Sequence, residues 1–116
     1  MYYVSKRMEI AGAHQLKLPY ESKCSNLHGH NWIITVHCKG EALMNHGMLI
    51  DFKHIKEAVQ EKLDHKYINE VIDFNPTAEN MAKWICDEID KMCPIHTICY
   101  KVEVQESEGN IAVYEI

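Results

Sequence analysis

The sequence predicts an α+β fold in which two helices cover one face of a four-stranded antiparallel sheet, in the chain order ββααββ. Apolar and polar residues alternate in two segments near the N-terminus and two near the C-terminus, which is typical of strands with one buried face. Two segments between them carry apolar residues at helical spacing. At 116 residues the chain has the length of one domain, so we expect a single domain over residues 1–116.

The two N-terminal strands are expected to bring histidines to one end of the sheet. In residues 2–14 the even positions are mostly apolar and end on His14. In residues 28–38 the even positions again share one face, which begins with His28 and His30. If the strands pair antiparallel, the end of the first meets the start of the second. His14 can then approach His28 and His30.

The middle of the chain carries start signals and apolar stripes for two helices. The first helix follows Asp51, a residue type that caps helix N-termini. Its stripe consists of Phe52, Ile55, Val59 and Leu63. The second helix starts at Pro76 or Thr77. Its stripe consists of Met81, Trp84 or Ile85, Ile89 and Met92.

The C-terminal part returns to alternation, with a strand over residues 98–106, a turn at 107–110 and a last strand over 111–116. One face of the first of these strands carries Ile98, Tyr100, Val102, Val104 and Glu106. A four-stranded sheet with helices on one side leaves its other face and its edges uncovered. We therefore expect a homo-oligomer.

Composition narrows the class of protein. The net charge is −5 and the twelve Lys and Arg residues are spread singly, so the chain offers no basic stripe for nucleic acid. It has neither an N-terminal apolar signal region nor an apolar run long enough to span a membrane, and we interpret it as cytoplasmic. Five cysteines without a secretion signal do not predict a disulfide framework. Four of them are interpreted as small apolar residues: Cys38, Cys86, Cys93 and Cys99.

The three histidines have the arrangement of an open metal site. His28 and His30 point to the same side of a strand, and His14 from the neighbouring strand supplies a third corner of a tetrahedral zinc site, with one position open. The alternative is that His28 and His30 are surface histidines at the start of a strand. Cys24 is either a fourth ligand that closes the site or a nucleophile or base beside the metal, and its spacing leaves both readings open.

Two further groups have the residue types of catalysis or binding. Asp64 beside His65 at a helix end suits a carboxylate that orients an imidazole acting as a general acid or base. The alternative is a solvated histidine near the negative end of the helix dipole. Glu106 ends an apolar strand face, so its carboxylate has either a dedicated donor or solvent around it.

Together, the segments "AGAH", "CSNLHGHNW", "GMLIDF", "LDHKYIN", "NPTAEN" and "QES...AVY" resemble, in order and over nearly the whole chain, the 6-pyruvoyl-tetrahydropterin synthase family and its 6-carboxy-tetrahydropterin branch. The resemblance implies the tunnelling fold, in which ββααββ subunits join into a barrel, commonly as a hexamer or tetramer with active sites between subunits. The branch is indicated by the three residues between Cys24 and His28, where the animal pyruvoyl-forming enzymes have five.

The resemblance also implies roles for individual residues. It implies one Zn²⁺ per subunit, held by His14, His28 and His30, and a catalytic trio of Cys24, Asp64 and His65. It implies that Glu106 grips the 2-amino and N3 edge of a pterin. Thr77 and Glu79 match positions from which the family contributes further pterin contacts from a neighbouring subunit, although Thr77 also suits a helix cap and Glu79 a first-turn acid.

The implied reaction converts 7,8-dihydroneopterin triphosphate to 6-carboxy-5,6,7,8-tetrahydropterin, with release of acetaldehyde and triphosphate, in the pathway to queuosine. The first alternative is the pyruvoyl-forming synthase, which shares the site residues and differs in product. A more distant one is a non-enzymatic, zinc-stabilised interaction module. Lys17, Lys23 and Lys66 are each candidates for the triphosphate, and none has the context of a phosphate-binding loop.

Overall fold

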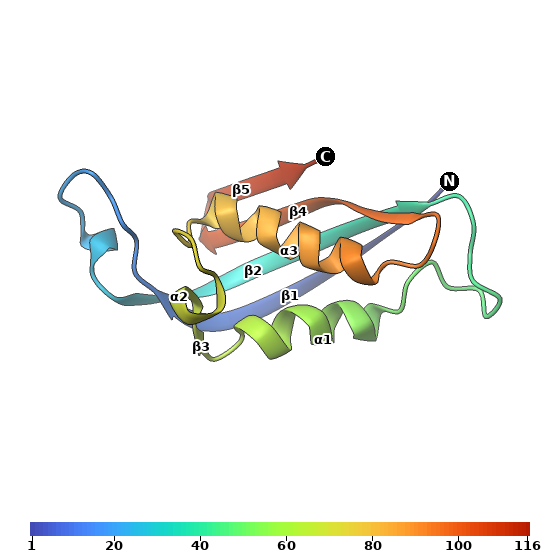
Figure 1. The fold of residues 1–116 in the computed structure, drawn as a ribbon, viewed down its shortest axis with the longest axis horizontal. Coiled ribbons are helices and arrows are strands. Elements are labelled where there is room, and N and C mark those ends of the chain that lie inside the picture. The colour runs from blue at the N-terminus through green and yellow to red at the C-terminus, as the bar shows by residue number, and fades with distance from the viewer.

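The computed structural model describes all 116 residues. The strands are β1 (Tyr2–His14), β2 (His28–Gly40), β3 (Lys66–Tyr67), β4 (Thr97–Ser107) and β5 (Asn110–Glu115). The helices are α1 (Phe52–Leu63), α2 (Ile68–Val71), α3 (Ala78–Met92) and a 3-10 turn, η1 (Lys23–Ser25). Helices α1 and α3 lie across one face of the sheet (Figure 1), which confirms the predicted α+β fold. None of the helices combines the length and the apolarity needed to cross a membrane.

The sheet has five strands in the order β3-β1-β2-β4-β5, so the expectation of four was one short. The additional strand, β3, pairs parallel with β1 through Lys66 and Tyr67 only. Two residues show no alternation that a sequence pattern could reveal. The single turn of α2 escapes prediction for the same reason, because four residues carry no helical periodicity.

Local capping explains where the helices begin. The Asp51 side chain accepts a hydrogen bond from the Lys53 N–H at the start of α1, as predicted. Thr77 caps α3 in the same way by accepting from the Asn80 N–H. The stripe of α1 is buried from Ile55 onward, whereas Phe52 in the first turn is 49% exposed, which corrects the prediction for that residue.

A β-bulge changes the predicted face of β4. His37 of β2 is opposite Lys101 and the next residue, Cys38, is opposite Cys99, so Tyr100 is the extra residue. The alternation therefore shifts at this point, and Cys99 is buried while Ile98 is 41% exposed. From Val102 onward the predicted face is the buried one.

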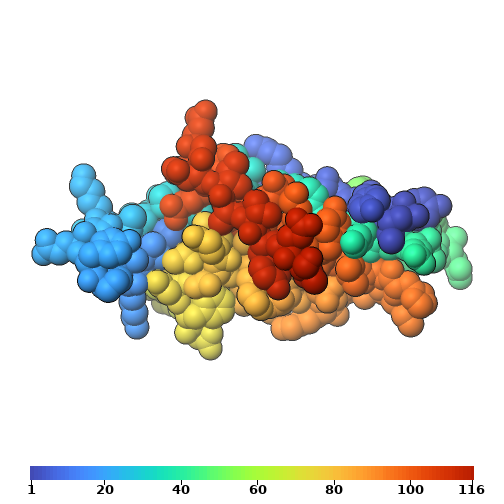
Figure 2. Space-filling view, turned by 90° about the horizontal axis from the view of Figure 1, so that it is seen from above, coloured from blue at the N-terminus to red at the C-terminus, as the bar shows by residue number.

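The core lies between the sheet and the helices, and the opposite face of the sheet is open in a single chain. Large buried side chains include Trp32, Ile34 and Ile85. Strand β5 forms one edge of the sheet and lies at the surface (Figure 2), where Ile111 and Val113 are about half exposed, at 56% and 51%.

Candidate metal site

The register of β1 and β2 sets His14 directly opposite His28, with Gly12 opposite His30. One ring nitrogen from each of the three histidines lies within 4.8 Å of the other two. His14 is fully buried, while His28 and His30 are partly exposed. The three side chains thus converge at one end of the sheet. The loop of residues 15–27 leaves the sheet at this end (Figure 1).

Backbone carbonyls fix the tautomers of two of these rings. His14 Nδ1 lies 2.8 Å from the Pro76 carbonyl oxygen, and His28 Nδ1 lies 2.7 Å from that of Asn26. A carbonyl oxygen can only accept, so both Nδ1 atoms carry hydrogen. In the neutral rings both Nε2 atoms then hold lone pairs, yet they lie 2.9 Å apart. Two lone pairs at this distance repel one another unless a cation lies beside both.

The donor set fits a metal ion. The buried Nε2 atom of His30 has no hydrogen-bond partner, as expected of an atom that has another ligand. Burial lowers the pKa of both His14 and His30, which favours the neutral imidazole that metals bind. Nitrogens bound tetrahedrally at 2.0–2.1 Å lie about 3.3 Å apart, close to the observed 2.9 Å between the His14 and His28 nitrogens. The hydrogen bonds at Nδ1 hold the rings as partners behind metal ligands do.

Glu106 lies beside the histidine cluster rather than in open solvent. Its Oε1 atom is 3.5 Å from His14 Nε2 and 3.7 Å from His30 Nε2, and its side chain is 26% exposed. The pairing of β4 with β5 skips from Gln105 to Ser107, so Glu106 sits on a second bulge. Bulges re-aim side chains and are frequent next to active sites. Glu106 is thus partly enclosed beside the cluster rather than fully solvated, and the chain itself offers its carboxylate no hydrogen-bond donor.

A hollow of about 460 Å³ adjoins this carboxylate. Its lining includes Glu106, Glu79 at the start of α3, and Asn110 at the start of β5. Glu79 and Glu106 of one chain therefore face the same space. Thr77 lies just before this helix and has its hydroxyl engaged as the N-cap, so the structure shows it in the capping role.

Asp64 and His65 both contact Ala11 of β1, which lies three residues before His14. Asp64 Oδ1 accepts a hydrogen bond from the Ala11 N–H at 2.9 Å, and the His65 N–H donates to the Ala11 carbonyl at 2.6 Å. His65 Nε2 lies 3.6 Å from Asp64 Oδ2, and the His65 side chain is 82% exposed. The backbone of His65 has a φ of 57°, a left-handed conformation that is uncommon for a residue other than glycine. Both backbone groups of Ala11 are thus used to hold the pair.

Gly12 allows this arrangement to form beside the histidines. A side-chain carbon on Gly12 would lie 3.0 Å from the Lys66 carbonyl oxygen and 3.2 Å from the Trp32 ring. Glycine therefore permits the close approach of β3 to β1, which brings the chain just after His65 against the strand that ends in His14.

Cys24 is carried by the loop of residues 15–27, which projects from the end of the sheet (Figures 1 and 2). The side chain is partly exposed, and it is not among the residues whose metal-binding atoms cluster. No hydrogen bond or ion pair joins it to Asp64, His65 or the histidine cluster within the chain. The structure therefore shows the three histidines together and the Asp64–His65 pair together, with Cys24 apart from both.

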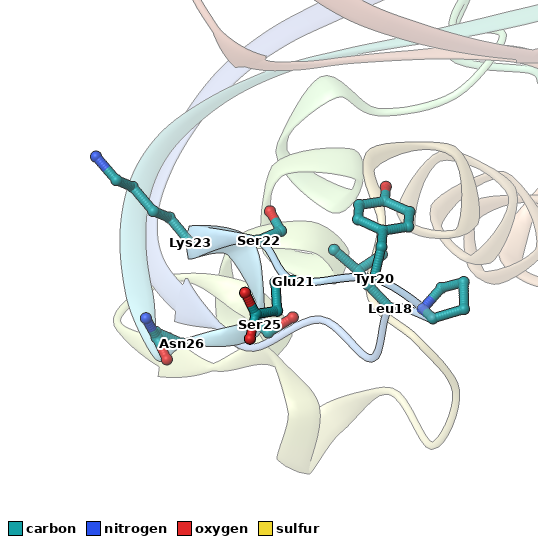
Figure 3. Close-up of a pocket in the computed structure, with 8 residues that line it drawn as sticks. Leu18, Tyr20, Glu21, Ser22, Lys23, Ser25 and Asn26 are labelled. Carbon is teal, nitrogen blue, oxygen red and sulfur yellow. The ribbon is translucent and has the colours of Figure 1, made fainter.

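The largest hollow belongs to this loop rather than to the histidine cluster. It is a shallow, open hollow along the loop from Leu18 to Asn26, and several of the side chains that line it are polar (Figure 3). Cys24 does not line it. Tyr20, at its rim, is 65% exposed. The hollow is formed by this one projecting loop, and it contains none of the histidines of the cluster and neither Asp64 nor Glu106.

Some contributors to the site carry no sequence signal. The carbonyl groups of Pro76 and Asn26, which fix two histidine rings, belong to the backbone and leave no trace in residue type. Trp32 is different, because its position two residues after His30 predicts the same strand face. Its buried ring lies 5.0 Å from that of His14 and 5.2 Å from that of His30, and it forms the apolar floor of the cluster.

The fold and the site define an α+β protein with a three-histidine cluster able to hold a metal ion and a carboxylate beside it. The chain belongs to the 6-pyruvoyl tetrahydropterin synthase family, which matches residues 3–116.

Similar proteins include both pyruvoyl-forming and carboxy-forming synthases, by their names. The 6-pyruvoyl tetrahydrobiopterin synthase of Homo sapiens is 33% identical over 97% of this chain and 90% of its own length. The 6-carboxy-5,6,7,8-tetrahydropterin synthase of Bacillus subtilis is 28% identical over 97% of this chain and 84% of its own. The structure of Caenorhabditis elegans 6-pyruvoyl tetrahydropterin synthase superposes with a TM-score of 0.79 at 25% identity, covering 99% of this chain and 95% of that one.

Proposed function

We propose that the protein is a zinc-dependent lyase that converts 7,8-dihydroneopterin triphosphate to 6-carboxy-5,6,7,8-tetrahydropterin, releasing acetaldehyde and triphosphate. The observation that carries the proposal is the convergence of His14, His28 and His30, with Cys24 separated by only three residues from His28. This short spacing favours the carboxy-forming reaction. The identity to the human synthase supports the pyruvoyl-forming reaction as a second candidate.

Each group of the site has a role in this reaction. His14, His28 and His30 would hold the zinc ion, and the bound ion would supply acidification of the substrate hydroxyls and stabilisation of negative charge on oxygen. Cys24 as thiolate takes a proton from the side-chain carbon. His65, oriented by Asp64, moves protons to and from the ring and the hydroxyls. Glu106 accepts hydrogen bonds from the 2-amino and N3 groups of the pterin, and Thr77 and Glu79 of a neighbouring subunit make further pterin contacts.

The complete site forms between subunits of a homo-oligomer. Three features of the single chain support this proposal: His65 is 82% exposed, Cys24 lies apart from the other groups, and β5 and one sheet face are uncovered. Residues Tyr2, Tyr3, Ile111 and Val113 expose apolar surface that an adjoining subunit can bury. Light scattering after size-exclusion chromatography measures the assembly, and a monomeric, fully active protein would contradict it.

Product analysis tests the proposed reaction. The purified protein, loaded with zinc, is incubated with 7,8-dihydroneopterin triphosphate, and the products are identified by mass spectrometry. We expect 6-carboxy-5,6,7,8-tetrahydropterin together with acetaldehyde. Detection of 6-pyruvoyl-tetrahydropterin without acetaldehyde would establish the second candidate. Absence of any pterin product would favour the non-enzymatic interaction module.

Replacing Glu106 with glutamine tests its role as the pterin anchor. The variant retains shape but loses the charge that strengthens hydrogen bonds to the ring, so pterin affinity should fall by about 2 kcal/mol. Zinc content should be unchanged, since the three histidine ligands remain. Calorimetric titration with a pterin and metal analysis measure the two quantities. Loss of zinc with unaltered pterin affinity would instead make Glu106, which lies 3.5 Å from His14 Nε2, a metal ligand.

Two substitutions at Asp64 separate its structural role from its catalytic one. Asp64→Asn keeps an oxygen to accept from the Ala11 N–H, so its stability should be close to that of the wild type. Asp64→Ala leaves that donor without its partner, which should cost about 1–3 kcal/mol of unfolding free energy. Both variants should lose turnover, because neither holds a carboxylate beside His65. Urea unfolding and steady-state kinetics measure these effects, and full activity in Asp64→Asn would remove the catalytic role.

A further inference from the structure

Two asparagine side chains hold the segment that follows His14. Gln15 donates its N–H to Asn69 Oδ1 at 2.9 Å, and Asn69 Nδ2 donates to the Gln15 carbonyl at 2.8 Å. Lys17 donates its N–H to Asn75 Oδ1 at 2.9 Å, and Asn75 Nδ2 donates to the Lys17 carbonyl at 2.9 Å. Each asparagine therefore satisfies both backbone groups of one residue.

The two asparagine side chains make the hydrogen bonds that the backbone of a neighbouring strand would make. The asparagine amide has the same donor and acceptor as a peptide group. In an extended segment, alternate residues direct their backbone groups to the same edge, and Gln15 and Lys17 are two residues apart. The residue between them, Leu16, uses the other edge and donates its N–H to the Cys24 carbonyl at 3.0 Å. The two asparagines thus continue the edge pairing of β1 beyond its last residue, and the 3-10 turn that carries Cys24 is bonded to the opposite edge of the segment.

The segment Asn75–Pro76 contacts both the Cys24 loop and a histidine of the cluster. Asn75 holds Lys17, and the next residue, Pro76, accepts from His14 Nδ1 at 2.8 Å. The Asn75 carbonyl is itself fixed by the Asn80 side chain at 2.9 Å, one turn into α3. The start of α3 therefore sets the position of the Cys24 loop and of His14 relative to each other.

We propose that Asn69 and Asn75 are positioning residues that hold the Cys24 loop in register with the histidine cluster, a role whose catalytic consequence rests on the proposed function. They contact backbone rather than substrate and act through Cys24. The Asn75 amide is required for its donor and acceptor together, not for its shape. A carboxylate in its place still accepts from the Lys17 N–H but sets an oxygen against the Lys17 carbonyl.

The test compares Asn69→Ala, Asn75→Ala and the isosteric Asn75→Asp with the wild type. Amide hydrogen exchange of residues 15–17 and the rate of Cys24 alkylation by iodoacetamide, followed by mass spectrometry, report loop order without any need for turnover. Loss of two hydrogen bonds should raise amide exchange in this segment about tenfold or more and accelerate alkylation. The kcat should fall, with KM and bound zinc nearly unchanged. If Asn75→Ala does not fold, Asn69→Ala carries the same test at Gln15.

Asn45→Ala is the matched control, because Asn45 is exposed in the loop before α1 and its side chain makes no hydrogen bond. It should leave exchange, alkylation and kcat unchanged. Unaltered exchange and alkylation in the Asn69 and Asn75 variants would overturn the proposal, as would faster exchange with an unchanged kcat. If the wild type turns over no dihydroneopterin triphosphate, the proposed function fails, while exchange and alkylation still decide whether the asparagines hold the loop.

Discussion

Cys24→Ala is expected to lower turnover of dihydroneopterin triphosphate by about 10²–10⁴-fold, the usual contribution of a positioned proton-transfer group. Zinc should remain bound at one ion per chain, because the three histidines that converge on one point are untouched. The rate is measured by mass spectrometry of the product, and zinc by elemental analysis of the dialysed protein. Cys24→Ser should be similarly impaired, since a hydroxyl is a far weaker acid than a thiol and seldom supplies the required base.

The control for this experiment is Cys93→Ala, which removes a half-buried thiol at the end of α3 and should leave turnover near the wild-type value. Stoichiometric loss of zinc in Cys24→Ala would contradict the catalytic assignment. It would show that the thiol closes the metal shell, and it would revive the interpretation of the protein as a zinc-stabilised interaction module.

His28→Ala is expected to abolish zinc retention and, with it, turnover. Loss of a hydrogen-bond partner behind a metal ligand already weakens metal binding about 10–100-fold, and loss of the ligand itself should exceed that. The metal-free variant should be no less stable than the metal-free wild type, since it lacks the close approach of two ring nitrogens at 2.9 Å. Competition with a chelator gives the affinity, and urea unfolding without metal gives the stability.

Trp32 provides a second readout of metal binding. Its ring lies 5.0 Å from that of His14, so a paramagnetic ion such as Co²⁺ at the cluster should quench its fluorescence in the wild type and not in His28→Ala. Trp84→Phe removes the other tryptophan from the signal. His54→Ala, on the exposed side of α1, serves as the histidine control. Retention of zinc and turnover in His28→Ala would mean that His28 is not a ligand.

The parts of the fold that depend on periodicity were predictable from the sequence. Strands β1 and β2 pair without a bulge, so the approach of His14 to His28 and His30 follows from the shared parity of the three residues and the antiparallel direction of the strands. The bulge at Tyr100 could not be read, because a one-residue shift is determined by pairing with β2 and not by the composition of β4. The two-residue strand β3 depends in the same way on contact with β1.

The candidate site was likewise predictable only where residue type and strand periodicity determine it. Histidines and carboxylates can be found by residue type, and a strand pattern indicates which of them share a face. The second bulge, at Glu106, and the left-handed backbone of His65 are tertiary features that residue type does not encode. Asn69 and Asn75 could not be predicted as positioning residues. Asparagine is a common loop residue, and nothing in the sequence indicates that these two bind the backbone of Gln15 and Lys17.

The burial of His14 would couple binding of the proposed metal ion to folding of the chain. The ring is fully enclosed, and its Nδ1 is committed to the carbonyl that precedes the cap of α3. An ion at its Nε2 therefore binds the folded chain and finds no comparable site in the unfolded one. By linkage, free zinc at one hundred times its dissociation constant raises the unfolding free energy by about 2.7 kcal/mol. With zinc as the proposed ion, its availability would set the lifetime of the folded chain as well as the rate of turnover.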